Sequence, residues 1–484
     1  MKFTHLSAAL LGAVCSFQLA APAAVKLPAV FGDNMVLQQQ QAVPVWGWAD
    51  PKARVTVKFA GQTRSTRADA SGKWLVKLAK MPASCMPQAL VVESGESITL
   101  TNILVGEVWL ASGQSNMEKP IGMQRGQQPT LNYEQELAAA IYPQVRIFLV
   151  EKELSAKPLD QLLKFQGWQE CSSNSLNTMH FSAAAYFFGR ELHTNLNVPI
   201  GLIESSWGGT RVEPWTPPVG FQSVPSLAKV TTPAFGTNKI PNTAPTVLYN
   251  AMIAPIAGFG MRGAIWYQGE SNRSDTNYDA KMAALVGGWR QVWHEGPFPF
   301  YFVQIAPFKY IKDLTTYSAE TDPLPPFWLS QSRAARHIAN AGMIVTTDLV
   351  DDLSDIHPRN KKEVGHRLAL LALDKTYEQP VPSTGPAFKQ MVVIGNKAFL
   401  SFKHLHGGLV SQDGQPLTWF TIAGADRKFV PAEAKIVGDN VVVSAAGVEC
   451  PKAVRFAWNQ IAQPNLVNAA GLPAEPFSTD HPVN

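Results

Sequence analysis

Between residues 104 and 385, short apolar runs alternate with stretches of helical spacing, and this alternation restricts the possible fold more than any other feature. Strands are predicted at 108–111, 145–150, 198–204, 264–268, 300–305 and 342–347, and helices at 183–192, 279–293, 329–339 and 361–374. Alternating strands and helices form a largely parallel sheet wrapped by helices. The sequence therefore predicts an α/β domain over residues 103–385.

Four of the predicted strands stop at glycine or polar residues. These stretches lie at 112–116, 205–210, 269–272 and 351–358. Because the carboxyl ends of parallel strands meet at one edge of a sheet, we expect the four stretches to form a single pocket there.

Ser115 follows the strand at 108–111, in the sequence SGQSNM of residues 112–117. Gly113 permits a sharp bend, and Asn116 tolerates a tight backbone. A hydroxyl on the residue after such a bend points outward at the edge of the sheet. We therefore interpret Ser115 as a candidate nucleophile, although Gly, Ser and Asn are also common in ordinary turns.

The regions on either side of the α/β domain have a different pattern. Residues 25–102 and 386–484 contain short runs in which apolar and polar residues alternate, separated by turn residues. Period-two alternation is typical of antiparallel β-sheets. We predict a β-sandwich domain at each end and favour a packing role for the first, although Trp46, Trp48 and Trp74 leave a sugar-binding role open.

The composition excludes some classes of partner. The chain has 484 residues, of which 46% are apolar and 16% charged, and its net formal charge is only +4. Without a basic cluster, we expect no nucleic-acid partner. Residues 1–24 are predicted to be a signal peptide, so the mature protein is expected to be secreted or periplasmic, with no membrane span. The sequence leaves the oligomeric state open.

Other motifs give no support for a cofactor or metal. The cysteines after residue 24 are Cys85, Cys171 and Cys450, which suit no metal knuckle and allow at most one disulfide. The GxGxxG pattern at 258–263 precedes a predicted strand, whereas a dinucleotide-binding loop follows one. His404 and His406 have no third ligand nearby. We therefore expect neither a metal nor a cofactor.

Three ordered blocks resemble those of the SGNH-type esterases. They are GQSNM at 113–117, WYQGESN at 266–272 and DIHP at 355–358, and the chain is most similar to the sialate O-acetylesterase family of carbohydrate esterases. The resemblance covers nearly the whole mature chain. It implies an SGNH-hydrolase-like three-layer sandwich with a parallel central sheet between two β-sandwich domains. It also implies a carbohydrate O-acetylesterase acting on sialic acid without a cofactor.

Two alternatives stay open at this point. Related esterases that share these blocks act on acetylated xylan or other glycans, so an acetyl xylan esterase or another glycan deacetylase is the first. A non-catalytic glycan-binding protein is the second, although intact Ser115, His357 and Gln268 argue against it.

Ester hydrolysis requires a nucleophile and a base that takes its proton. His357 lies in a polar loop beyond a predicted strand, and its near-neutral pKa suits a general base. The resemblance places an aspartate three residues before this histidine, but that position is Ser354 here. Asp355 is two residues before His357, so both side chains point the same way on an extended segment. We favour Asp355 as the third member, with a backbone carbonyl or Glu270 as alternatives.

An oxyanion hole is the remaining requirement. We expect its donors to be the backbone N–H groups of Ser115 and of Gly208 or Gly209, with the side-chain amide of Gln268 or Asn272. The residues expected to line the substrate pocket are Gln114, Asn116, Arg211, Glu213, Trp215 and Glu270. Arg211, Glu213 and Trp215 could equally form an internal structural network.

Overall fold

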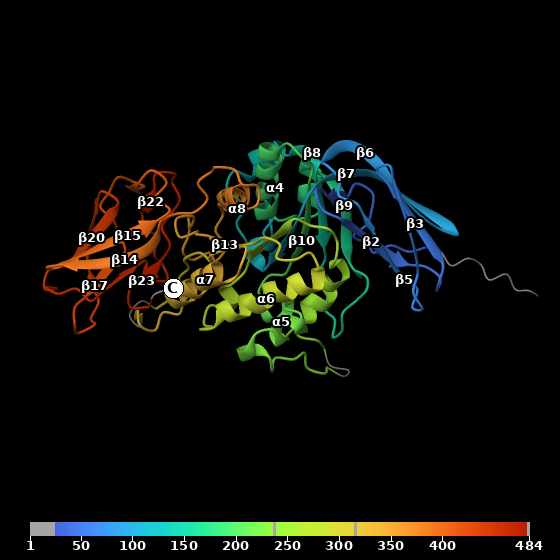
Figure 1. Cartoon of the computed structure of the whole chain (residues 1–484). Coiled ribbons are helices and arrows are strands. Elements are labelled where there is room, and N and C mark those ends of the chain that lie inside the picture. Colours follow the sequence, from blue (N-terminus) through green and yellow to red (C-terminus); the bar gives the residue numbers. More distant parts are fainter. Residues whose placement is uncertain (1–24, 236–238, 314–316, 482–484) are drawn as a thin grey trace, which may run out of the picture.

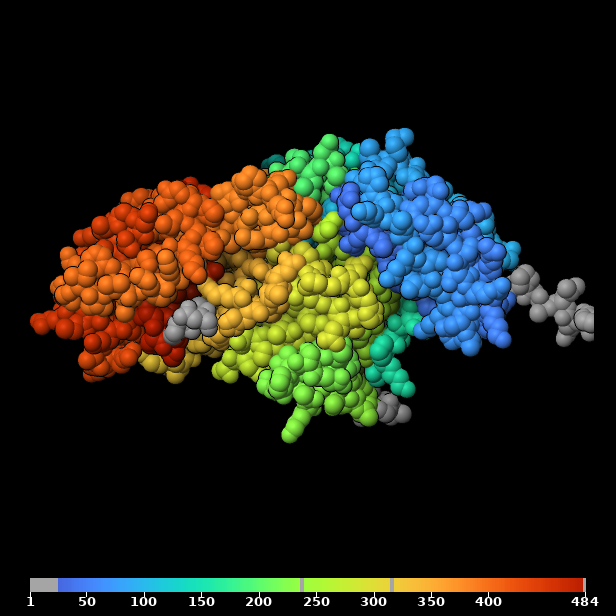
Figure 2. Space-filling model, viewed as in Figure 1, coloured from blue at the N-terminus to red at the C-terminus, as the bar shows by residue number. Residues whose placement is uncertain are grey.

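The computed structural model describes residues 25–235, 239–313 and 317–481. An α/β domain lies between a β-rich N-terminal region and a β-rich C-terminal region (Figure 1). The space-filling view shows the three parts side by side along the length of the molecule (Figure 2). The predicted signal peptide at 1–24 lies outside the described residues.

The central sheet has the strand order β13-β12-β11-β7-β10-β8-β9. Its strands are β7 (Glu96–Gly113), β8 (Ile141–Val150), β9 (Phe165–Ser172), β10 (Ile200–Ser206), β11 (Gly263–Tyr267), β12 (Phe300–Val303) and β13 (Ala341–Ile344). All neighbours on this path pair in parallel except β8 and β9, which are antiparallel. The α/β prediction is confirmed, but the sheet is mixed: an antiparallel strand borders its otherwise parallel strands.

Strand β7 connects the N-terminal region to the α/β domain. Its first part pairs with β6, and its last part pairs with β10 and β11, so one strand passes through the predicted boundary at residue 102. The other strands of this region are β1 (Val36–Gln38), β2 (Val43–Trp48), β3 (Arg54–Phe59), β4 (Gln62–Arg67), β5 (Lys73–Leu78) and β6 (Ser84–Ser94). Strands β3, β4 and β6 extend the sheet of β7, whereas β2 and β5 form a separate two-stranded sheet. The boundaries of the predicted domains stay a prediction.

Helices cover both faces of the central sheet, and the alternation of side chains along each strand decides which face a residue joins. Val108 and Leu110 of β7 belong to one buried cluster with the helices α6 and α7. Trp109 and Ala111 belong to the opposite cluster, with α4 and α8. The long helices are α4 (Ala183–Leu196), α6 (Tyr278–Trp293), α7 (Leu324–His337) and α8 (Lys361–Lys375). The sheet is therefore buried on both sides, as parallel sheets are.

Helix α7 begins five residues earlier than the apolar spacing predicts. Pro325 and Pro326 occupy its first turn, where proline is favoured because no intrahelical N–H bond is lost. Short helical segments complete the domain: α1 (Ser115–Glu118), α2 (Tyr133–Ala138), α3 (Ser173–Thr178), α5 (Pro218–Gln222), η1 (Glu213–Trp215), η2 (Pro225–Leu227), η3 (Tyr249–Ile253), η4 (Ala254–Ile256) and η5 (Glu270–Asn272).

The C-terminal strands form two four-stranded sheets and one two-stranded sheet around a single apolar core. They are β14 (Ala387–Ile394), β15 (Lys397–Lys403), β16 (Leu409–Ser411), β17 (Phe420–Ala423), β18 (Val430–Pro431), β19 (Glu433–Val437), β20 (Asn440–Ser444), β21 (Ala453–Phe456), β22 (Leu466–Asn468) and β23 (Phe477–Ser478). The Gln460 amide exchanges two hydrogen bonds with the backbone of Ile311, at 2.9 and 3.1 Å, and so ties this region to the α/β domain.

The three cysteines of the described chain are all unpaired, and burial raises the pKa of the Cys171 thiol to about 12. In residues 25–235, 239–313 and 317–481, no helix has the length and apolar character needed to cross a membrane.

Candidate active site

Strand β7 delivers Ser115 to the carboxyl edge of the sheet. Gly113 ends the strand at φ +144°, and a Cβ there would lie 2.2 Å from the backbone oxygen of Tyr267 in β11. Only glycine fits this close approach. Ser115 then begins the short helix α1, with its side chain half-buried. After β7 the chain continues to β8, on one side of β7 in the sheet, whereas after β11 it continues to β12, on the other side. The site lies between β7 and β11, where the two connections diverge, and ligands bind at such points in open α/β sheets.

A chain of hydrogen-bond contacts connects Ser115 to His357 and His357 to Asp355. The Nε2 atom of His357 is 2.9 Å from the Ser115 hydroxyl, although 242 residues separate them in the chain. The Nδ1 atom is 3.2 Å from Asp355 Oδ1, which also accepts the His357 backbone N–H at 2.9 Å. Ser354, at the position where the resemblance has an aspartate, instead donates to Asp352 at 2.6 Å. Asp355 therefore holds the imidazole in the orientation that a general base needs.

The environment of His357 favours its neutral form. Burial, followed by the positive charge of Lys361, lowers the pKa of His357, and the carboxylate of Asp355 opposes this. Lys361 is itself fully buried, and burial lowers its pKa to about 7. Lys119 is buried as well, with a pKa lowered to about 8 by burial. A neutral imidazole with a free Nε2 lone pair is the form that accepts the proton of a serine.

Two side chains fix the loop that carries His357. Asn116 Nδ2 donates to the backbone oxygen of Ile356 at 3.0 Å, and Lys361 Nζ donates to that of Pro358 at 2.7 Å. Lys361 Nζ also donates to Asn116 Oδ1 at 2.7 Å, so the two side chains that fix the loop are hydrogen-bonded to each other. The backbone is thus fixed on both sides of the histidine by residues anchored next to the serine.

Both side-chain amides that were expected to face the oxyanion donate hydrogen bonds to other groups of the protein. The Gln268 amide is fully buried and donates to Gln114, the Thr210 carbonyl and Asn272 at 2.8–3.1 Å. Asn272 Nδ2 donates to Glu213 at 3.1 Å and to Asp275 at 2.7 Å. Both amides therefore organise the floor of the site and have no N–H directed at a substrate.

The two glycines of the 208–209 turn differ. The N–H of Gly208 donates to Glu118 Oε2 at 2.6 Å, so it too has an acceptor. A Cβ on Gly208 would lie 3.1 Å from the Ser115 Cβ, which places this turn directly beside Ser115. Gly209 is exposed, at φ +74°. In the part of the chain that the structure describes, the backbone N–H groups of Ser115 and Gly209 have no acceptor.

Arg211 and Glu213 belong to an ion network rather than to an open sugar pocket. Arg211 pairs with Asp275 at 2.8 Å and with Glu213 at 3.2 Å, and Lys281 joins both carboxylates. Trp215 is fully buried and donates to the Thr210 hydroxyl at 3.0 Å. The structural alternative that the sequence left open therefore describes these residues better than contact with substrate, since their polar atoms bond to each other.

Gln114 and Glu270 are also buried. Gln114 Oε1 accepts from Gln268 at 3.1 Å and from the Ser271 N–H at 3.3 Å. Glu270 Oε1 accepts from Asn116 at 2.6 Å, so Glu270 bonds to Asn116 and not to the histidine. Burial raises the pKa of the Glu270 carboxyl.

Sequence reasoning missed Lys361, Lys119 and Glu118. A lysine at the start of a helix is ordinarily solvated, so nothing local in the sequence distinguishes Lys361 from its exposed neighbour Lys362.

A cleft of about 610 Å³ opens beside Asp355 and is lined by residues 123–129 and Asp352. Among the described residues, no group of three His, Cys, Asp or Glu side chains is arranged to hold a metal ion. A serine, a base and backbone donors at the carboxyl edge of the sheet provide the groups that acyl transfer requires.

Comparisons with known proteins agree with this geometry. The model of the family described as "Carbohydrate esterase, sialic acid-specific acetylesterase" matches residues 105–374. The chain is 30% identical to the human sialate O-acetylesterase, over 92% of this chain and 90% of the human protein. The mouse sialate O-acetylesterase is also 30% identical, over 92% of each chain.

A solved structure agrees over almost the whole chain. The crystal structure of a carbohydrate acetylesterase from Xanthomonas citri superposes with a TM-score of 0.84 and 36% identity, covering 94% of this chain and 100% of that one. The chain therefore belongs to the carbohydrate esterase family of sialic acid-specific acetylesterases.

Proposed function

We propose that this protein hydrolyses O-acetyl esters of sialic acid through an acetyl-serine intermediate. The observation that supports this most is the 2.9 Å contact between Ser115 and His357 in a chain of the sialic acid-specific acetylesterase family. The human and mouse relatives are both named sialate O-acetylesterases, which supports sialic acid as the sugar.

In the first half of the reaction, His357 Nε2 takes the proton of Ser115 while the serine oxygen attacks the acetyl carbonyl. Asp355 faces the Nδ1–H and stabilises the imidazolium that forms. The imidazolium then gives its proton to the departing sugar oxygen, which leaves an acetyl-serine. In the second half, His357 takes a proton from water, the hydroxide attacks the acetyl-serine, and acetate leaves as Ser115 recovers its proton.

The oxyanion hole that we propose consists of the backbone N–H groups of Ser115 and Gly209. Both lack an acceptor within the described residues, and the 208–209 turn lies against the serine. The Glu118 carboxylate that accepts the Gly208 N–H fixes the position of this turn. Each donor of this kind typically stabilises the transition state by about 2.7–4 kcal/mol.

The decisive experiment is acetate release from O-acetylated N-acetylneuraminic acid by the wild type and by Ser115→Ala. We expect the variant to lose the activity while it keeps its fold, because within the described residues the Ser115 hydroxyl bonds only to His357. Acetylated xylo-oligosaccharides serve as the competing substrate. Faster turnover of the xylo-oligosaccharide would contradict the proposed substrate, and unchanged turnover in Ser115→Ala would contradict the mechanism.

We also propose that the protein is exported. Residues 1–24 combine Lys2, an apolar run and small residues before the described chain begins at Val25. Expression of the full chain in a Gram-negative host, followed by fractionation and N-terminal sequencing, tests this. A cytoplasmic product that retains Met1 would contradict it.

A further inference from the structure

Glu270 is a buried carboxylate that takes no part in the proposed acetyl transfer. It is the first residue of η5, three residues after β11 ends at Tyr267, and only 3% of it is exposed. Gly269 forms the turn between them at φ +156°, where a Cβ would lie 2.7 Å from Ile305 Cγ2, so glycine is needed there. A side chain that is costly to bury unless it is paired therefore lies at the carboxyl edge of the sheet.

One amide connects Glu270 to the loop that carries the base. Its Oε1 accepts from Asn116 Nδ2 at 2.6 Å, and no other described side chain bonds to this carboxylate. The same Nδ2 donates to the backbone oxygen of Ile356 at 3.0 Å, so both of its hydrogens are used. Asn116 is only 1% exposed, which removes bulk water as a competing acceptor. Glu270 is thus one amide away from the residue that precedes His357.

Lys361 binds the other end of the same amide. Its Nζ donates to Asn116 Oδ1 and to the backbone oxygen of Pro358, both at 2.7 Å. Glu270 and Lys361 carry opposite charges and attract each other across the amide. Because the carboxylate accepts from the nitrogen and the ammonium donates to the oxygen, only one of the two amide orientations satisfies both groups. The buried pair therefore fixes which way the Asn116 amide points.

The orientation of this amide bears on the position of the base. Ile356 precedes His357 and Pro358 follows it, so the backbone on both sides of the histidine is bonded within the same network. The His357 Nε2 atom must stay within reach of the Ser115 hydroxyl, 2.9 Å away. A misplacement of about 1 Å in such a contact can lower the rate about 100-fold. Without the carboxylate, one Nδ2 hydrogen would be buried without an acceptor, which favours movement of the amide away from Ile356.

We propose that Glu270 is a positioning residue for the esterase reaction, which acts by fixing the Asn116 amide and, through it, the backbone that carries His357. It contacts neither the substrate nor the reacting atoms. The inference rests on the proposed function, in which His357 is the base. A purely structural role would instead alter stability with no specific effect on the rate, and a substrate contact would alter KM.

The test compares three Glu270 variants in the hydrolysis of p-nitrophenyl acetate, an ester that needs the base but no sugar site. We expect kcat to fall about 10- to 100-fold in Glu270→Ala, with little change in KM. Glu270→Asp keeps the charge but withdraws the acceptor, so it should also lose kcat. Glu270→Gln keeps an oxygen that accepts from Asn116 Nδ2 and should recover most of the wild-type kcat. A raised KM with normal kcat, or an equal loss of kcat in Glu270→Gln and Glu270→Ala, would overturn the proposal.

A double-mutant cycle tests whether the effect passes through Asn116. Asn116→Ala removes the amide that joins Glu270 to the loop, so Glu270→Ala should cause no further loss of kcat in that background. A residue with an independent role would lower kcat by the same factor in both backgrounds. Equal factors would therefore contradict the proposal, even if each single variant has a reduced rate.

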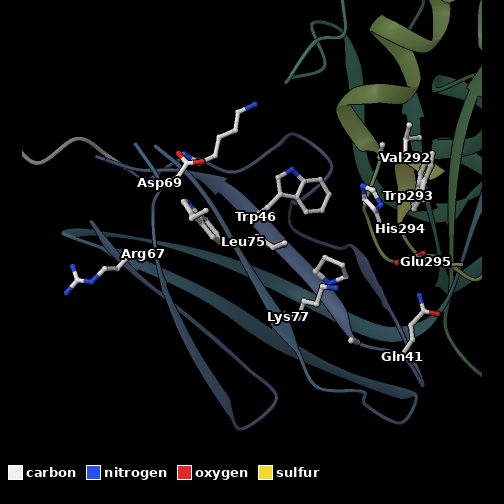
Figure 3. Close-up of a pocket in the computed structure, with 16 residues that line it drawn as sticks. Gln41, Trp46, Arg67, Asp69, Leu75, Lys77, Val292, Trp293, His294 and Glu295 are labelled. Carbon is white, nitrogen blue, oxygen red and sulfur yellow. The ribbon is translucent and has the colours of Figure 1, made fainter. Parts of the chain in front are cut away.

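Glu295→Ala is the matched control. Glu295 follows α6 and lines a cavity of about 800 Å³ between the end of that helix and the β2–β5 sheet (Figure 3). In Glu295, as in Glu270, one carboxylate oxygen accepts an N–H group and the other is buried without a hydrogen-bond partner among the described residues. Glu295 precedes β12, near the amino ends of the parallel strands, whereas Ser115 follows a carboxyl end. Its replacement should leave kcat unchanged, and a loss equal to that of Glu270→Ala would contradict a specific role for Glu270.

Acetate release from O-acetylated N-acetylneuraminic acid, measured in parallel with Ser115→Ala, separates this inference from the proposed function. If hydrolysis of p-nitrophenyl acetate depends on Ser115 but the acetylated sugar is not cleaved, the proposed substrate is wrong, and the Glu270 variants still decide the role of Glu270. If Ser115→Ala hydrolyses p-nitrophenyl acetate as fast as the wild type, the mechanism is wrong and the role of Glu270 with it. Unchanged kcat in Glu270→Ala, with full dependence on Ser115, would overturn only the role of Glu270.

Discussion

Asp355→Asn tests the least expected member of the triad. The substitution keeps the shape of the side chain and an oxygen that accepts the His357 backbone N–H at 2.9 Å. It removes the negative charge that lies 3.2 Å from Nδ1. A hydrogen bond to a charged group typically contributes about 1.5–3 kcal/mol, and each 1.36 kcal/mol of barrier changes the rate tenfold. We expect kcat/KM for acetate release to fall about 10- to 150-fold.

Asp352→Asn is the control, because Asp352 lies in the same loop but its carboxylate, among the described residues, accepts hydrogen bonds only from Ser354, at 2.6 and 2.8 Å. It should retain activity. The pH profile gives a second measurement that a general disturbance of the loop would not change. Asp355 raises the pKa of His357, so its neutralisation should move the acid limb of kcat/KM to lower pH. Near wild-type rates in Asp355→Asn, or an equal loss in Asp352→Asn, would refute the assignment.

Three further outcomes follow from the same structure. Lys361→Met removes a cation that lowers the pKa of the catalytic imidazole, so the acid limb should move to higher pH, whereas Lys362→Met, at an exposed neighbour, should not move it. Burial raises the pKa of Glu204 to about 8. Between about pH 4.5 and 8 the carboxyl is therefore protonated in the folded protein and loses its proton on unfolding. The stability that the protonated carboxyl contributes is lost as the pH rises through this range. Glu204→Gln should therefore raise the free energy of unfolding, measured by urea denaturation, by up to about 5 kcal/mol relative to the wild type at about pH 8, and by little at about pH 4.5. Parallel curves of stability against pH would contradict this. Gly113→Ala places a Cβ 2.2 Å from a carbonyl oxygen of β11 and should lower both Tm and activity, whereas Gly126→Ala, with no atom within 4 Å, should cost only backbone strain of about 1 kcal/mol.

The strands and the position of Ser115 at the sheet edge were predictable because their signals are local. Apolar runs that end at Gly113 and at Gly269 identify buried strands with turns at their ends, and parallel strands bring those ends together. His357 was predictable from its loop and the block that contains it. The same local signal also led to the expectation that Gln268 faces the oxyanion, and here it failed. An amide beside the site has several possible partners, and only the packed structure shows that its N–H groups are used internally.

The sequence by itself determined which segments are strands and which residues have functional groups suited to acyl transfer, because periodicity, turn residues and side-chain functional groups are properties of short segments. Only the tertiary structure decided that β9 pairs antiparallel at the sheet edge, that Lys361 is buried beside His357, and that the amide N–H groups of Gln268 are used inside the protein. These features depend on contacts between residues far apart in the chain. Burial, hydrogen-bond satisfaction and charge pairing are properties of the assembled core, and no short segment contains them.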